Sequence, residues 1–223
     1  MLRTSAPRTL SKLSKTSITV AATKMNFLKT AGTVVKSTFT SSGLEKPEYE
    51  VVAKHDGYEE RHYAASKWVS TKSKGMKLED ASRKSFFKLF DYIQGKNAKE
   101  QKIDMTAPVA TLIEPGAGPN CESTFTMSFF VPPSNSTDTP EPTNPDLFLQ
   151  TWPAQTFFVR QFGGFTSDEK WLEHAKSLGE CLTGKEKFHE QFYYTAGYDS
   201  PFKLFGRTNE VWFLKKEEEQ AKE

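Results

Sequence analysis

The chain has 223 residues, of which 36% are hydrophobic, and a formal net charge of +2. This length is enough for one sizeable core and predicts a single folded domain. Outside residues 1–44 the chain holds 23 basic and 28 acidic side chains, and an acidic body without a basic stripe argues against a nucleic acid as the partner.

Residues 1–45 form a basic extension that is rich in Ser and Thr. Positions 1–44 carry seven Lys or Arg, sixteen Ser or Thr and no Asp or Glu. This composition is typical of an organelle transit peptide, and it also fits a disordered basic tail, with Met25 as an alternative start. A transit peptide predicts a mitochondrial address, and without one the cytoplasm is expected. No apolar stretch reaches the ~20 residues of a membrane span, so no span is expected.

The folded domain is expected over residues 46–216 and a charged tail over 217–223. Asp56-Gly57 is a strong hairpin signal, because Gly accepts the positive φ that tight turns require. Alternation on both sides of this turn predicts strands, and apolar residues at helical spacing further on predict a helix packed against them. In order, the elements expected are strands over 49–54, 58–63 and 68–72 and a helix over 78–93.

Two more strands and a linker are expected after this helix. The strands lie over 103–113 and 123–131. Pro108 requires the first of them to be bent, bulged or at a sheet edge, because proline cannot donate a ladder hydrogen bond. Residues 132–145 hold five of the twelve prolines and predict an exposed linker of extended character.

The second half of the domain repeats the first. Phe157–Phe162 returns the aromatic, Arg and aromatic of Tyr58–Tyr63 ninety-nine residues later, but His62 is answered by Gln161. The elements expected are strands over 148–151, 157–162, 192–195 and 211–214 and a helix from the N-cap Ser167 to about Leu182. Two such α+β halves predict one antiparallel, barrel-like sheet with two helices against it.

Six blocks of sequence follow one another in a distinctive order. They are Tyr58–Tyr63, Lys67–Thr71, Tyr92–Asn97, Met105–Val109, Tyr193–Tyr198 and Asn209–Trp212. Together they resemble the SOUL/haem-binding protein family over about residues 46–216. The resemblance implies an α+β fold in which duplicated βαβ-type halves form a distorted antiparallel β-barrel flanked by two helices. It also implies a protein without enzyme activity that binds haem or another tetrapyrrole as a carrier, buffer or sensor.

The resemblance implies a haem site in a surface apolar pocket, with His62 at the place of the strand histidine proposed as axial ligand. Neutral imidazole is a good axial ligand for haem iron, and alternation separates His62 from Arg61 by face. Haem also needs flat apolar cover and cations for its propionates. The candidates for cover are Trp68, Met76, Leu78, Phe86 and Phe90, and those for the cations are Arg61, Lys67, Lys72 and Lys74.

Signals for other chemistries are missing from the sequence. Cys121 and Cys181 make neither a disulfide framework nor a metal cluster, so haem iron is the one metal expected. No Cys-x-x-Cys-His, zinc-binding spacing, phosphate-binding glycine loop or nucleophile elbow appears.

An alternative function is a protein-interaction module in cell-death or mitochondrial regulation, without a physiological haem ligand. The family resemblance implies it through a BH3-like helical segment, whose equivalent here is around residues 174–184. This segment keeps Leu178 and Leu182 but lacks an acidic residue just after the leucines, which departs from the pattern that a Bcl-2-type groove binds. A third alternative is an apolar pocket for another flat or amphipathic small molecule.

Overall fold

The computed structural model describes residues 43–118 and 120–217 of the chain. The expected transit peptide or basic tail lies outside the described residues as far as residue 42, and so do residues 218–223 of the expected charged tail. In chain order the elements are β1 (Tyr49–His55), β2 (Tyr58–Tyr63), β3 (Ser66–Gly75), α1 (Leu78–Ile93), β4 (Val109–Glu114), β5 (Ser123–Phe130), α2 (Pro133–Ser136), β6 (Leu147–Trp152), β7 (Gln155–Phe162), α3 (Asp168–Leu182), β8 (Tyr193–Gly197) and β9 (Asn209–Leu214).

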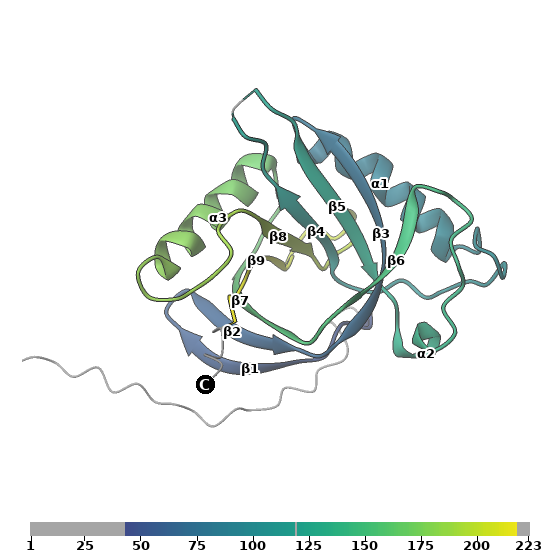
Figure 1. The fold of residues 1–223 in the computed structure, drawn as a ribbon, viewed down its shortest axis with the longest axis horizontal. Coiled ribbons are helices and arrows are strands. Elements are labelled where there is room, and N and C mark those ends of the chain that lie inside the picture. The colour runs from purple at the N-terminus through teal and green to yellow at the C-terminus, as the bar shows by residue number, and fades with distance from the viewer. Residues whose placement is uncertain (1–42, 119, 218–223) are drawn as a thin grey trace, which may run out of the picture.

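The strands form one antiparallel sheet in the order β1-β2-β7-β9-β8-β4-β5-β3-β6 (Figure 1). α1 packs on β3 and β5, and α3 packs on β7 and β9. The α+β fold with an antiparallel, barrel-like sheet is therefore confirmed. The sheet curls but stays open, because β1 and β6 are its edges and do not pair with each other.

The sheet contains an internal twofold repeat whose boundary differs from the expected one. Outward from the central β4–β8 pair, the order β5-β3-β6 on one side matches β9-β7-β2 on the other. The two copies are therefore β2-β3-α1-β4-β5 and β6-β7-α3-β8-β9, and β2 is the hydrogen-bonded neighbour of β7. The predicted equivalence of Tyr58–Tyr63 with Phe157–Phe162 is wrong, because alternating aromatic strands resemble one another at many offsets. His62 and Gln161 do not occupy equivalent positions.

Two other segments differ from the expected elements. The strand expected over 103–113 begins only at Val109, just after a cis Ala107–Pro108 peptide bond, since proline has no N–H for the ladder. Residues 132–145 are not an exposed linker. They include α2, and the hydroxyl of Tyr92 donates a hydrogen bond of 2.6 Å to the carbonyl of the buried Pro140.

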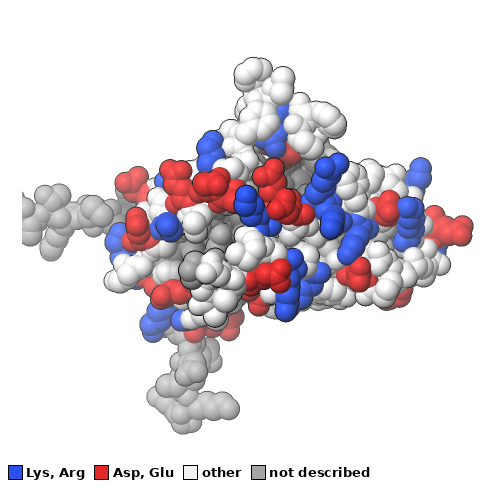
Figure 2. Space-filling view, turned by 90° about the horizontal axis from the view of Figure 1, so that it is seen from above, with Lys and Arg blue, Asp and Glu red and all other residues white. Residues whose placement is uncertain are grey.

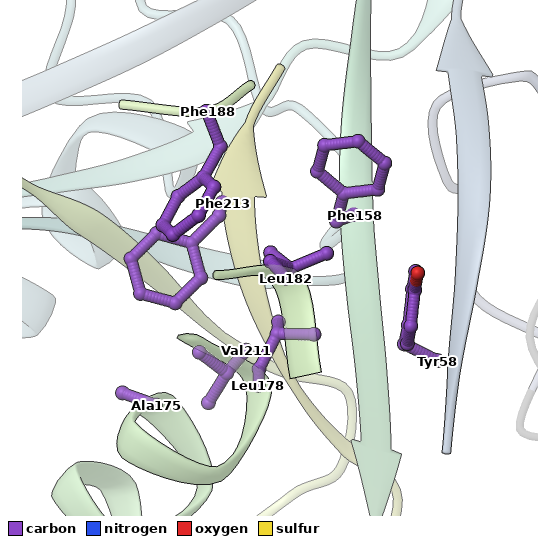
Figure 3. Packing of buried hydrophobic residues seen from close by; sticks show 8 residues of the cluster. All are labelled: Tyr58, Phe158, Ala175, Leu178, Leu182, Phe188, Val211 and Phe213. Carbon is purple, nitrogen blue, oxygen red and sulfur yellow. The ribbon is translucent and has the colours of Figure 1, made fainter. Parts of the chain in front are cut away.

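One face of the sheet is covered by the long helices. α3 buries Leu178 and Leu182 completely against Phe158 of β7 and Phe213 of β9 (Figure 3). A helix with a single apolar stripe gains most of its stability from such contacts. This packing fixes where α3 ends, and therefore where the chain after it meets the sheet.

The opposite face of the sheet encloses an aromatic interior. Trp68 of β3 stacks on Trp152 of β6 with ring centroids 4.3 Å apart, and Trp152 meets the ring of Tyr194 on β8 at 5.3 Å. β6 and β8 are not neighbours in the sheet. Their contact therefore follows from the curl, which brings an edge of the sheet over its middle.

Candidate functional site

His62 lies near the end of β2, on the face of the sheet that α3 covers. β2 alternates, so His62 shares this face with Tyr58, which packs against α3. His62 itself is exposed, and its Nδ1 lies 3.0 Å from Thr156 Oγ1 of the neighbouring strand β7. This contact orients the ring and engages Nδ1, so Nε2 is the ring nitrogen left for a ligand.

A cavity of about 910 Å³ opens beside His62. Its walls come from the end of β2, the turn between β6 and β7, the residues after α3 and the residues at the end of β9. Its histidines and lysines are His62, His189, Lys185, Lys187, Lys215 and Lys216. The volume is within the range of about 300–1,000 Å³ that is usual for cofactor and small-molecule sites.

Backbone hydrogen bonds hold the walls of this cavity together. Lys215 N donates to Thr156 O, and His189 N donates to Leu214 O, each at 2.9 Å. Phe188 also forms an isolated antiparallel bridge with Lys215. The segment after α3 thus joins the end of β9, and the cavity is part of the hydrogen-bonded sheet.

The charges around the cavity are mainly positive. Lys215 Nζ contacts Glu60 Oε1 at 2.6 Å and lies 5.6 Å from the ring centroid of Phe158, so this lysine is already neutralised. The other charged lining residues are Lys185, Lys187, Lys216, Glu186 and Glu217. Lys185 and Lys216 can each meet a carboxylate of a ligand at this cavity.

The comparisons with known proteins agree on one family. A family model described as SOUL heme-binding protein matches residues 44–214, a range that contains every helix and strand of the described structure. The chain belongs to the SOUL heme-binding protein family.

The alignments with three named relatives cover most of this chain and most of each relative. The chain is 48% identical over 162 residues to Heme-binding protein 2 of Homo sapiens, covering 72% of this chain and 79% of that protein. It is 43% identical over 180 residues to Heme-binding protein 2 of Mus musculus, with 78% and 88% covered. It is 33% identical over 177 residues to Heme-binding protein 1 of Xenopus tropicalis, with 78% and 93% covered.

Arg61, expected near the propionates in a SOUL-family site, lies on the opposite face of β2 from His62. Its Nη1 donates to Glu210 Oε1 at 2.9 Å, and the two side chains are 5% and 3% exposed. Burial alone would lower the pKa of the Arg61 guanidinium, but the charge of Glu210 and the neighbouring Tyr63, Tyr49 and Tyr198 together outweigh it and raise that pKa. The structure therefore does not bring Arg61 together with His62.

The other predicted pocket residues lie away from the cavity beside His62. Trp68 is 1% exposed in the aromatic interior, and Lys67 Nζ donates to Ser136 O at 2.8 Å. Leu78 lines a separate cavity of about 280 Å³ at the N-terminal ends of α1 and α3. Lys72 and Lys74 are on β3, Met76 precedes α1, and Phe86 and Phe90 are on α1, packed toward β3 and β5.

The cavity contains residues that the sequence did not reveal. Thr156, His189 and the lysines after α3 and at the end of β9 carry no local pattern that links them to His62. Only the strand order β2-β7-β9 brings them together. The sequence does show lysines after α3 and at the end of β9, but lysines alone indicate only a solvated surface.

The BH3-like segment of residues 174–184 overlaps the second half of α3. Leu178 and Leu182, the side chains that a Bcl-2-type groove would hold, are 0% exposed and packed on the sheet. Such a partner therefore requires α3 to leave the sheet. A Bcl-2-type interaction stays a prediction, and it requires these buried contacts of α3 to be broken.

The described residues hold neither a cluster of direct metal ligands nor a helix suited to span a membrane. Over residues 43–118 and 120–217, no three His, Cys, Asp or Glu side chains are grouped so that they would bind a metal ion directly. None of the helices in that part of the chain has the length and apolar character needed to cross a bilayer.

Proposed function

We propose that this protein binds haem, or a closely related tetrapyrrole, in the cavity beside His62. The description of its family and the names of its relatives support haem as the ligand. The observation that supports the location is the exposed imidazole of His62, oriented by Thr156 at the wall of a cavity of about 910 Å³.

The residues of the cavity fit the chemistry of haem. Haem supplies an iron that accepts an imidazole nitrogen, and the Thr156 contact leaves Nε2 of His62 for this purpose. Lys185 and Lys216 provide cations for the propionates, and Leu214 provides apolar contact. The proposed role of His62 is to hold the iron, and that of the lysines is to orient the carboxylates.

We assign the protein a role as carrier, buffer or sensor, without enzyme activity. Haem enzymes control polarity and access with an enclosed distal pocket. Here Lys185 and Lys187 at the cavity are exposed. An accessible site of this kind favours uptake and release of the ligand.

A haemin titration tests the ligand and its location. We expect a saturable Soret shift with the wild-type protein and an affinity lower by about tenfold or more with His62→Ala. His174→Ala is the matched control, because His174 of α3 stacks on Phe162 of β7 and is not part of the cavity lining. This variant should bind haemin as wild type does. A saturable shift unchanged by His62→Ala would leave haem binding but reject this site, and no saturable shift at all would reject the function.

Thr156 gives a second and independent test. Thr156→Val removes the hydroxyl that orients His62 while keeping the shape of the side chain. Loss of such an orienting partner usually weakens metal binding on the order of tenfold, so we expect a weaker haemin affinity with the fold intact. Thr156→Ser should retain the wild-type affinity, and equal affinities for the Val and Ser variants would contradict the orienting role.

We further propose that residues 1–44 direct the protein to mitochondria. The support is their basic, hydroxyl-rich and acid-free composition. A fusion of residues 1–44 to a fluorescent protein should accumulate in mitochondria on imaging. A diffuse cytoplasmic signal would show that the extension is a basic tail without this function.

A further inference from the structure

The connection between β8 and β9 holds the most exposed large apolar side chains of the described residues. Phe202, Leu204 and Phe205 are 89%, 65% and 86% exposed. The connection leaves the sheet on the side away from the viewer in Figure 1, and Figure 2 shows a largely uncharged projection on that side, at the top of the view. Bare apolar groups gathered in this way usually mark a contact surface.

Hydrogen bonds inside the connection hold its shape. Arg207 Nη1 donates to Ser200 O at 2.8 Å and to Lys203 O at 2.9 Å. Asp199 accepts hydrogen bonds from Lys203 Nζ at 2.6 Å and from Thr208 N at 2.5 Å. The apolar side chains therefore stand on an ordered turn, which lowers the entropy cost of binding.

The connection carries a small net positive charge, from Lys203 and Arg207 against Asp199. Asp199 is the one acidic residue between positions 198 and 208, and its side chain is 3% exposed, whereas that of Lys203 is 32% exposed. The guanidinium of Arg207 lies 4.9 Å from the ring centroid of Phe165, which is itself 53% exposed. Lys203 is paired with Asp199, so Arg207 gives the connection its net positive charge.

We propose that this connection inserts its tip into the surface of an anionic lipid bilayer. A bilayer interface accepts isolated aromatic and aliphatic side chains, and its anionic headgroups attract the net positive charge of the connection. A specific protein interface uses about 20–30 residues on each side, which is far more than one short loop supplies. The contact is peripheral and needs no membrane-spanning segment, and it involves none of the residues that line the cavity beside His62.

Vesicle binding by the full chain tests the proposal. The protein is sedimented with phosphatidylcholine vesicles that contain phosphatidylglycerol and with vesicles of phosphatidylcholine alone. We expect binding to the anionic vesicles that is about tenfold weaker in Phe202→Ser/Phe205→Ser. Phe87→Ser is the control, since Phe87 is 56% exposed on α1, and it should bind as wild type does. All these side chains are exposed, so the unfolding temperatures should be equal.

A reporter at the tip separates the loop from the basic N-terminal residues, which also attract anionic vesicles. In Phe205→Trp, the emission in excess of wild type should shift to the blue when anionic vesicles are added. Equal binding of wild type and the double Ser variant, no blue shift, or no binding by wild type would each overturn the proposal. The double variant should titrate haemin as wild type does, so that this proposal and the haem proposal fail independently.

Discussion

At the scale of single residues, the ion pair of Arg61 and Glu210 shows how the interior holds charge. Tyr198 Oη and Trp212 Nε1 donate to Glu210 Oε2 at 2.7 and 2.8 Å, while Arg61 occupies Oε1. The Arg61 guanidinium also lies 4.6 Å from the ring centroid of Tyr49. A buried pair is tolerated when its remaining hydrogen-bonding capacity is met in this way, and removing one partner leaves an uncompensated charge.

We therefore expect Arg61→Met to lower the free energy of unfolding by about 3–5 kcal/mol, as measured by urea denaturation. Lys54→Met removes an exposed partner of Glu59, and it should cost about 1 kcal/mol or less. A loss below about 1 kcal/mol for Arg61→Met would contradict the role assigned to this pair.

Local alternation was sufficient to place Arg61 and His62 on opposite faces of their strand. It was not sufficient to identify their partners, because Glu210 is far along the chain and Thr156 belongs to another strand. The sequence therefore predicted one of the two imidazoles at the cavity, that of His62, but assigned the propionate contacts to cations that lie elsewhere. Such contacts depend on strand order, which no local pattern reports.

At the scale of elements, α1 and α3 are joined at their N-termini by one carboxylate. The N-cap residue of α1, Lys77, makes no side-chain capping hydrogen bond. Asp168, the first residue of α3, instead accepts hydrogen bonds from the backbone N–H groups of Leu78 at 3.1 Å and Glu79 at 3.2 Å. One helix thus supplies the cap that the other lacks, which ties the two halves of the repeat together.

Asp168→Ala should lower the free energy of unfolding by about 1 kcal/mol, because the first turn of α1 loses its acceptor. Asp168→Asn keeps an acceptor oxygen and should lose less. Urea denaturation followed by far-ultraviolet circular dichroism measures both variants. An unchanged midpoint for Asp168→Ala would show that water replaces the carboxylate at no cost.

The bounds of both long helices were predictable because their signals are local. Residues 78–93 have a helical apolar stripe before Gly95, and Ser167 caps α3 by accepting from Lys170 N at 3.3 Å. The repeat boundary was not predictable from one sequence, since it depends on pairing between β4 and β8. Local periodicity predicts individual helices and strands. Only the long-range pairing of strands shows which of them are equivalent in the two copies of the repeat.

At the scale of the whole molecule, the interior contains tyrosines that resist ionisation. Burial, and then the charge of Glu114, raises the pKa of Tyr194 to about 12. Burial likewise raises the pKa of Tyr92 and of Tyr193 to about 12. In the unfolded chain a tyrosine titrates near pH 10. Between about pH 10 and 12 the unfolded state therefore loses protons that the folded state keeps, and stability falls as the pH rises.

We expect the free energy of unfolding of the wild type to decline above about pH 10. Tyr194→Phe should reduce the slope of this decline by up to about 1.4 kcal/mol per pH unit, because one titrating group is removed. Urea midpoints measured from pH 8 to 11 test this expectation. The two proteins should have parallel profiles below about pH 9, and parallel profiles at pH 11 as well would refute the assignment.

Within residues 43–118 and 120–217, the open sheet leaves backbone donors and acceptors along the outer sides of β1 and β6 without a strand beside them. Such borders can recruit strands from other copies of the same molecule and begin aggregates. Here β1 is irregular between Val51 and Ala53, and β6 is bounded by Pro145 and Pro153. These interruptions shorten the regular stretch that a second molecule can extend, and so help this half-open architecture to remain dispersed at high concentration.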